Sequence, residues 1–223
     1  MKSFEKLNLF KEKLELIKQE VPESVQVYFD NLADFLFNNI QICAEKDTYS
    51  FVEVEFYYYD KIKFNGPIYE CTYPRTRTLS SFFWHNSGLD ICFDSNEDQG
   101  YYGGILIRSL MKHSKEGDEI IAGPIRAVNE LMNSCKDKMP FLVDKTTKDN
   151  MRPQNTIRYG IAADRDALII KKADIISRYC YYYPQTNWAR IHKVNNSIKR
   201  YYYNAQPEKR ELISCLLSLN TKD

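Results

Sequence analysis

The chain has 223 residues, of which 43% are hydrophobic and 27% charged; these fractions are normal for a globular protein, and the length suits one domain with a sizeable core. The net charge of +1 divides unevenly, because residues 1–149 hold 18 Lys and Arg against 24 Asp and Glu, whereas residues 150–223 hold 13 against 6. No apolar run approaches the length of a membrane span, so we expect no membrane-spanning helix.

The basic last third of the chain also carries Trp188 and many of the 17 tyrosines. Basic side chains interleaved with aromatic rings suit a nucleic-acid backbone or a nucleotide phosphate. The same pattern fits a basic face that pairs with the acidic remainder of the molecule, and charge alone does not separate these interpretations. For any single tyrosine we expect a half-buried place in a strand rather than stacking on a ligand.

The cysteines and histidines show no metal-ligand spacing. None of the six cysteines forms a C-x-x-C pair, and none of the three histidines pairs with a cysteine at ligand spacing; we therefore expect no zinc site. The N-terminus is charged and helical in pattern rather than like a signal peptide. These features predict a cytoplasmic protein with reduced thiols.

The first 40 residues have the apolar spacing of two helices. Apolar side chains recur at helical intervals over residues 3–20, and a second helix is predicted to begin at Pro22 and to continue to Ile40. We expect this helical segment, residues 1–46, to pack as a cap on a core formed by residues 47–223. Its aromatic stripe is predicted to belong to the core rather than to a ligand site.

Residues 49–60 have the alternation of a strand. Successive strand residues point to opposite faces of a sheet. One face is then predicted to hold two carboxylates beside two phenols, and the other to be apolar: Glu53, Glu55, Tyr57 and Tyr59 against Val52, Val54, Phe56 and Tyr58. A carboxylate beside an aromatic platform is what hydrolysis of a bond to a stacked base requires.

The remaining elements alternate short strands with a few helices. We interpret Gly100–Gly104 as a tight turn, and 61–81 as an irregular loop of a length that is often functional. The other predictions are strands at 82–93 with a turn at 86–88, at 105–107, 141–143, 156–161 and 175–183, a strand or short helix near 167–170, and helices from Pro124 and from Pro207 to Leu219. Because the strands are not regularly separated by helices, we predict a single α+β domain whose curved, mostly antiparallel sheet is flanked by helices.

Four motifs follow one another in an order that resembles the alkyladenine (3-methylpurine) DNA glycosylase family. They are VEVEFY at 52–57, GLDICF at 88–93, GILIRSL at 104–110 and GPIRAVNEL at 123–131, with TIRYGI at 156–161 and RYCY at 178–181 similar to the closing strands of that family. The resemblance covers roughly residues 49–185 and implies the fold of that family. It also implies a metal-independent enzyme of DNA base-excision repair that requires no organic cofactor.

The resemblance implies a role for each matched residue. Glu55 would activate a water that attacks the sugar carbon of a flipped nucleotide, Tyr57 would stack on the extruded base, and Arg108 would contact the nucleotide backbone and order the site. Trp84 takes the place of a pocket tyrosine. Apart from the resemblance, a nucleotide or nucleic acid bound by the basic last third of the chain would receive phosphate contacts from Lys171, Lys172, Arg178, Arg190, Lys193, Lys199 and Arg200.

The chain departs from the family in two places. The family has a histidine in the loop that follows the stacking tyrosine, whereas residues 66–73 contain none. Tyr69 or Glu70 would take its place there, and His85 is the nearest histidine. The wedge tyrosine that fills the hole left by a flipped base falls near Ser87, and a serine cannot fill that hole in a duplex.

Each candidate residue also has a structural interpretation. Glu53 and Glu55 could form a solvated strand edge that faces Lys61 or Lys63, and Arg108 could anchor the end of a strand through an ion pair. Three functions therefore stay open: a DNA glycosylase-like hydrolase acting on a modified purine, a non-catalytic protein that binds a nucleotide or nucleic acid on the same scaffold, and a module whose tyrosines face a protein partner.

Overall fold

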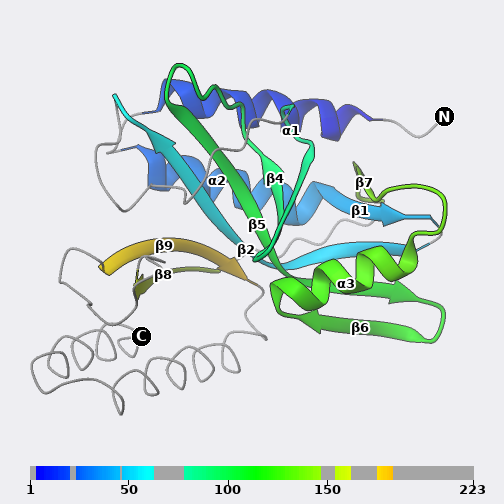
Figure 1. Ribbon diagram of the computed structural model, residues 1–223. Helices are drawn as coiled ribbons and strands as arrows, with labels where there is room; N and C mark the ends of the chain where they lie inside the picture. Colours follow the sequence, from blue (N-terminus) through cyan, green and yellow to red (C-terminus); the bar gives the residue numbers. More distant parts are fainter. Residues whose placement is uncertain are drawn as a thin grey trace, which may run out of the picture.

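The computed structural model describes residues 4–20, 24–45, 47–62, 78–146, 154–161 and 175–182, the last two ranges and residues 25–26 by their backbone alone. Within these ranges the fold is α+β, as predicted, with three α-helices and a curled antiparallel sheet (Figure 1). The helices are α1 (Glu5–Glu15), which a 3₁₀ turn η1 (Leu16–Gln19) extends, α2 (Val25–Asn39) and α3 (Pro124–Ser134). The strands are β1 (Ile40–Ala44), β2 (Asp47–Asp60), β3 (Phe82–His85), β4 (Gly88–Cys92), β5 (Tyr101–Ser114), β6 (Gly117–Ala122), β7 (Phe141–Asp144), β8 (Gln154–Ile161) and β9 (Ile175–Tyr182).

Two long antiparallel strands, β2 and β5, form the centre of the sheet, and each has 14 residues. Each offers its outer edge to two shorter strands in turn: β5 pairs with β4 and then β6, and β2 pairs with β1 and then β9. The sheet therefore forks near the middle of the central pair. Arg108 lies at this fork, because β4 pairs with β5 up to Ile107 and β6 pairs with it from Ser109.

The two faces of the sheet are covered differently. Helix α2 lies behind the sheet and α3 in front of part of it (Figure 1). On the back face, Phe29 of α2 meets Phe56 of β2 with 4.9 Å between ring centroids, and Phe93 joins both rings. The apolar half of the β2 alternation thus forms the core, and the half with the carboxylates faces front.

Two residues that follow each other at the end of β7 hold the two N-terminal helices. Asp144 accepts hydrogen bonds from the backbone N–H groups of Lys6 (3.2 Å) and Leu7 (2.8 Å), which are in the first turn of α1. No side chain within α1 caps that turn. A carboxylate at this position satisfies N–H groups that the helix leaves unbonded and complements the helix dipole.

Lys145 binds the C-terminal end of α2. Its Nζ donates to the carbonyl oxygen of Phe37 at 3.2 Å, and its backbone N–H donates to the carbonyl oxygen of Asn39 at 2.7 Å. A cation near the last carbonyls of a helix is the favourable arrangement. The dipeptide Asp144–Lys145 at the end of β7 therefore fixes the start of α1 and the end of α2.

Gly103 and Gly104 lie inside β5, so the tight turn predicted at Gly100–Gly104 is wrong beyond its first residue. The turn ends at Gly100 (φ 75°), and the strand begins at Tyr101. A Cβ on Gly103 would lie 2.4 Å from the carbonyl oxygen of Tyr57 and 2.8 Å from the ring of Tyr58. The glycine is needed because backbone and ring approach it so closely, rather than for a turn.

Other sequence predictions meet the structure with mixed success. The strands at 49–60, 82–93, 141–143 and 156–161 are confirmed, as are the helix from Pro124 and the strand at 175–183 over its described residues 175–182. The strand predicted at 105–107 is longer than expected, because β5 extends from Tyr101 to Ser114. Two strands, β1 and β6, were not predicted. Most of the loop at 61–81, the segment near 167–170 and the helix after Pro207 lie outside the described residues. Strand β1, which falls within the predicted segment 1–46, pairs with both β2 and β7.

We expect Asp144→Ala to lower the free energy of unfolding by about 1 kcal/mol, because α1 loses its only described cap. Asp98→Ala serves as the control, since Asp98 is exposed in a surface turn. Urea denaturation followed by circular dichroism measures both variants. Equal stability of the two variants would show that the Asp144 carboxylate contributes nothing to α1.

Gly103→Ala is expected to cost about 1–3 kcal/mol, since the added methyl group must displace the β2 backbone or an aromatic ring. Glu119→Ala, at an exposed position in β6, provides the comparison for placing alanine in a strand. Thermal unfolding of both proteins decides the matter. An unfolding midpoint for Gly103→Ala at or above the wild-type value would contradict the close approach.

Candidate functional site

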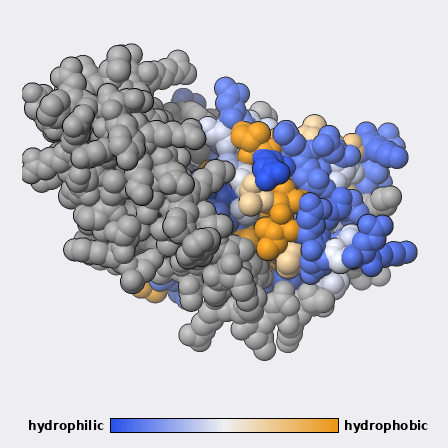
Figure 2. Space-filling view, turned by 90° about the horizontal axis from the view of Figure 1, so that it is seen from below, coloured by the Kyte–Doolittle hydropathy of each residue, from blue (hydrophilic) through white to orange (hydrophobic). Residues whose placement is uncertain are grey.

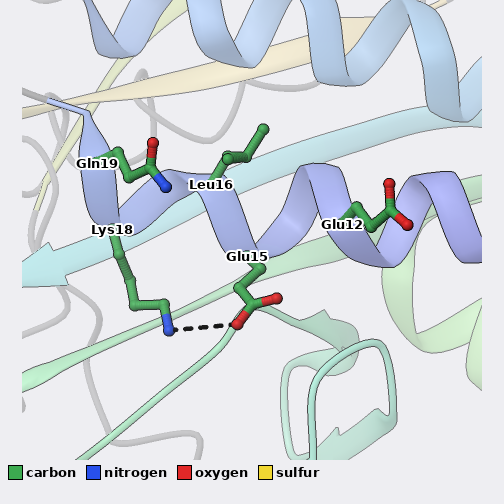
Figure 3. Close-up of a pocket in the computed structure, with 5 residues that line it drawn as sticks. All are labelled: Glu12, Glu15, Leu16, Lys18 and Gln19. Carbon is green, nitrogen blue, oxygen red and sulfur yellow. Dashed lines mark ion pairs between the residues drawn. The ribbon is translucent and has the colours of Figure 1, made fainter.

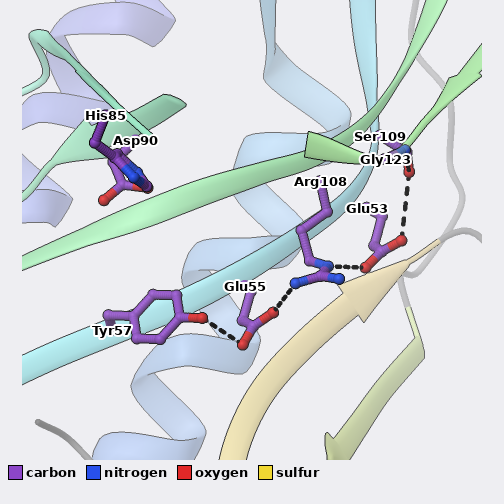
Figure 4. Close-up of polar contacts among 8 residues, drawn as sticks. All are labelled: Glu53, Glu55, Tyr57, His85, Asp90, Arg108, Ser109 and Gly123. Carbon is purple, nitrogen blue, oxygen red and sulfur yellow. Dashed lines mark hydrogen bonds and ion pairs between the residues drawn. The ribbon is translucent and has the colours of Figure 1, made fainter. Parts of the chain in front are cut away.

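Arg108 forms ion pairs with both carboxylates of the front face of β2. Its Nε lies 2.6 Å from Oε1 of Glu53, and its Nη1 donates to Oε2 of Glu55 at 2.6 Å (Figure 4). Glu53 is aligned with Ser109 at a register shift, directly next to Arg108, and Glu55 is aligned with Leu106, which lies two residues before Arg108 on the same face. Strand pairing itself thus brings a guanidinium between two carboxylates that are two residues apart.

Tyr57 completes this network from the other side of Glu55. Its hydroxyl donates to Oε1 of Glu55 at 2.5 Å. The two residues share a face at i and i+2 of one strand, as the alternation predicted. The structure therefore brings together the three residues Glu55, Tyr57 and Arg108 (Figure 4).

The carboxylates lie in the interior. Glu55 is 0% exposed and Glu53 8%, so the interpretation of the pair as a solvated strand edge facing Lys61 or Lys63 is wrong. The Arg108 side chain is 19% exposed, and Tyr57 is half-buried. A buried carboxylate needs a cation and hydrogen bonds to offset its lost hydration, and Arg108 supplies both. The alternative that Arg108 acts as an ion-pair anchor is therefore present in the structure.

Trp84 lies on the opposite face of the sheet from Glu55. The strand register aligns Trp84 with Leu89 of β4, Ile107 of β5 and Val54 of β2, all on the back face. Its ring packs against the core and meets Phe82 edge-on. Trp84 and Glu55 therefore do not line one pocket, because the pairing of β3 with β4 turns this side chain away.

His85 does lie on the front face, where it pairs with Asp90. Its Nε2 is 3.1 Å from Oδ1 of the fully buried Asp90, and its Nδ1 accepts the backbone N–H of Ser87 at 3.2 Å. This pattern requires the neutral imidazole with its proton on Nε2. Both ring nitrogens are thus engaged in fixing the β3–β4 hairpin.

The His85–Asp90 pair is separated from the Glu55 network by β5 (Figure 4). Asp90 is aligned with Leu106, and Leu106 with Glu55. Two strand spacings amount to about 10 Å, and the buried side chain of Leu106 occupies the position between them. The two polar groups are therefore neighbours on one face but not one constellation.

The remaining predicted site residues cannot be placed beside this network. Tyr69, Lys171 and Lys172 lie outside the described residues, as do Arg190, Lys193, Lys199 and Arg200. Arg178 is on β9, whose backbone pairs with β2 at Glu53–Phe56, and there it stands opposite Arg158 of β8. The predicted phosphate contacts thus stay predictions.

A second constellation, which the sequence did not indicate, links Ser50, His113 and Asp118. The Ser50 hydroxyl is 2.7 Å from Nε2 of His113, and Nδ1 of His113 is 2.9 Å from Oδ1 of Asp118. The order of groups is that of a serine-hydrolase triad. The burial is reversed, however, because Ser50 is 0% exposed while the Asp118 side chain is 53% exposed. A nucleophile must itself bond to its substrate, so this arrangement serves to join β2, β5 and β6.

A third polar cluster joins α3 to the central strands. Lys112 donates to Oε1 of Glu130 at 2.8 Å and lies 3.2 Å from Oδ2 of Asp47, while the Tyr49 hydroxyl donates to Glu130 at 3.0 Å. The hydrogen bond from Lys112 holds the pKa of Glu130 below its ordinary value. The hydrogen bond to Glu130 raises the pKa of Lys112, and burial raises the pKa of Tyr49 to about 12.

The surface of the described part offers two other features. A shallow groove along α1 and η1 is lined by Glu12, Glu15, Leu16, Lys18 and Gln19 (Figure 3). These side chains are exposed apart from the half-buried Lys18, and no buried polar group converges there. On the underside of the molecule, an apolar strip is bordered by hydrophilic surface (Figure 2).

Strand β6 and helix α3 carry exposed apolar side chains. They are Ile120, Ile125 and Met132. By contrast, the tyrosines whose side chains are described are buried or half-buried, in agreement with the expectation for strand tyrosines. Among the described residues, the exposed large apolar side chains are thus aliphatic residues, methionine and phenylalanine rather than tyrosine.

Two kinds of feature are absent from the described residues. No group of three or more His, Cys, Asp and Glu side chains is arranged to hold a metal ion among them. None of the described helices combines the length and the apolar composition that crossing a membrane requires.

Comparison with known proteins identifies no family. No protein-family model matches the chain, and no solved structure does. The chain is similar to an uncharacterized protein of Acanthamoeba polyphaga mimivirus, at 30% identity over a region that covers 52% of this chain and 62% of the viral protein. The match thus spans less than two thirds of that relative.

We expect the Glu130 contacts to make stability depend on pH in the acid range. A folded-state pKa below the ordinary 4.5 means that the contribution is present above that value and is lost as pH falls through the folded-state pKa. At neutral pH, Glu130→Gln should therefore be less stable than wild type by up to about 1 kcal/mol. The difference should shrink between about pH 5 and pH 3.

Urea denaturation at several pH values measures this difference. Glu116→Gln provides the control, since Glu116 is exposed in the turn between β5 and β6. A difference between Glu130→Gln and wild type that stays constant over the whole pH range would contradict the assigned ion pair.

Proposed function

We propose that this protein is a DNA glycosylase-like hydrolase that cleaves the N-glycosyl bond of a modified or alkylated purine, with Glu55 as the base that activates water. The observation that carries the proposal is the hydrogen-bonded group of Glu55, Tyr57 and Arg108. Two strands contribute these residues, and Arg108 is 53 positions from Glu55 in the chain. The motif resemblance had singled out the same three residues.

The chemistry needs a carboxylate that is held in one orientation. In the proposed step a water oxygen forms a bond to the sugar carbon, Glu55 takes a proton from that water, and the base leaves with the electrons of the broken C–N bond. Positive charge develops on the sugar, and a carboxylate stabilises it. Arg108 and Tyr57 each hold one oxygen of Glu55, which orients the group before substrate arrives.

The burial of Glu55 restricts how it can act. A base that activates a water molecule needs a passage only wide enough for that water. The sugar of the substrate contacts the water and does not have to reach the Glu55 carboxylate. The half-buried Tyr57 and the partly exposed Arg108 mark the side from which the water would enter. Ser50, which is equally buried, has no such option, because a serine nucleophile must itself contact the reacting carbon.

Aromatic surface next to Glu55 supports a planar substrate. Tyr59 follows Tyr57 on the front face, and its ring lies 5.0 Å from that of Tyr102 on β5. All three tyrosines are half-buried, so part of each ring faces outward. A base extruded from a helix loses its stacking, and aromatic rings offset that loss. The serine in place of a wedge tyrosine favours single-stranded DNA or a free nucleotide over a duplex.

A second candidate is a non-catalytic protein that binds a nucleotide or nucleic acid through the same face. The observation that favours it is the complete burial of Glu55 between two partners, which a structural ion pair shows equally well. On this interpretation Arg108 and the tyrosines would contact the ligand, and Glu55 would only orient them.

The two candidates differ in what Glu55→Gln does. If Glu55 is the base, the substitution should slow excision by about 100- to 10,000-fold, because glutamine cannot take the proton. The measurement is single-turnover release of 3-methyladenine or hypoxanthine from single- and double-stranded oligonucleotides. Under the second candidate, wild type and variant bind the oligonucleotides with strong salt dependence and release nothing.

Glu130→Gln is the matched control for that experiment. It removes the charge of another ion-paired glutamate, on the helix α3 rather than in the Glu55 network, and it should excise at the wild-type rate. Thermal unfolding of each variant confirms that the fold is kept. Full excision activity in folded Glu55→Gln would end the assignment of the base.

A further inference from the structure

We infer that Glu53 is a positioning residue, which holds the Arg108 guanidinium so that its Nη1 meets Glu55. This inference rests on the proposed function and extends it to a residue that sequence comparison leaves without a role. Oε1 of Glu53 lies 2.6 Å from Nε of Arg108, and its Oε2 accepts from the Ser109 hydroxyl at 3.4 Å.

The two carboxylates approach Arg108 at different nitrogens. Glu53 is next to Nε and Glu55 next to Nη1. Because a guanidinium is planar and rigid, contacts at two of its nitrogens fix both the direction of the group and its rotation about its own axis. A single contact to Glu55 would leave that rotation open.

The Glu53 contact is a short ion pair. Nε of Arg108 and Oε1 of Glu53 lie 2.6 Å apart, and the two groups carry opposite charges. An ion pair depends on distance and sign, so glutamine at position 53 should not replace glutamate. Aspartate keeps the charge and should restore part of the effect.

Glu53 is itself held from the N-terminus of α3. The Ser109 hydroxyl that donates to Glu53 also accepts the backbone N–H of Gly123 at 3.3 Å, and the same N–H donates to the carbonyl oxygen of Arg108 at 2.9 Å. Gly123 precedes α3 with φ 108°. The start of the helix thus fixes both the backbone of Arg108 and the carboxylate that orients its side chain.

The first test reads the position of Arg108 without any reaction. In a ¹⁵N–¹H spectrum of arginine side chains, the Nε–H signal that is missing from Arg108→Lys belongs to Arg108. We expect this signal to exchange slowly with water in wild type and at least about tenfold faster in Glu53→Gln, with Glu53→Asp in between. An unchanged exchange rate in folded Glu53→Gln would overturn the inference.

The second test reads the consequence for excision. Glu53→Gln should lower the single-turnover rate about tenfold while the affinity for the oligonucleotide stays within about twofold, and Glu53→Asp should recover part of the rate. In an Arg108→Lys background, Glu53→Gln should have a smaller effect, since a lysine has no second nitrogen for it to hold. Equal effects in both backgrounds, or a loss confined to affinity, would overturn the inference.

Failure of the proposed function is recognised separately. A wild-type protein that excises no base overturns the hydrolase, and the exchange rate of the Arg108 Nε–H then decides alone whether Glu53 positions the guanidinium. Glu130→Gln again serves as control, because its ion pair with Lys112 is separate from Arg108. It should change neither the Arg108 signal nor the rate.

Discussion

Two carboxylates on neighbouring front-face positions of one strand can be buried only if a cation reaches both. Arg108 is that cation. It reaches both carboxylates from the position in β5 where the neighbouring strand changes from β4 to β6. Removing one partner of a buried ion pair leaves an uncompensated charge, which typically costs about 3–5 kcal/mol. The antiparallel register of β2 and β5 is therefore coupled to electrostatics, because a slip by one residue would turn Glu53 and Glu55 into the aromatic core.

The same register explains how much of the fold could be predicted. Alternation over residues 51–60 revealed β2 and its two faces, since one face had to be buried by α2. Strand β1 continues the apolar pattern of α2 without a break and is buried throughout, so no periodicity marks where the helix ends. Strand β6 is an edge strand, exposed except at Ile121, and it lacks the alternation that burial imposes. Gly103 was misread because the close approach of Tyr57 is visible only in three dimensions.

The candidate site was predictable where it depends on neighbours in the chain. Glu55 and Tyr57 meet because they are two residues apart in a strand, and an arginine at the end of an apolar strand pointed to Arg108. The face of Trp84 depends on the two-residue connection between His85 and Gly88 and on the pairing of β4 with β5, neither of which composition reveals. Ser50, His113 and Asp118 belong to three strands, and no local pattern announces a contact that depends on the register of all of them.

Because the network serves the fold and the proposed chemistry together, substitutions in it differ in what they can reveal. A neutral residue at position 108 would leave two buried carboxylates without their shared cation, so any lost activity would be confounded with unfolding. Glutamine at 53 or 55 instead leaves Arg108 with one carboxylate, and lysine at 108 keeps the positive charge while giving up the planar group with its second nitrogen. Catalysis and support can thus be separated only by isosteric or charge-conserving changes. The orientation of each group in the network depends on its neighbours. Glu53 and the start of α3 hold Arg108 in place, and Arg108 in turn orients the fully buried Glu55.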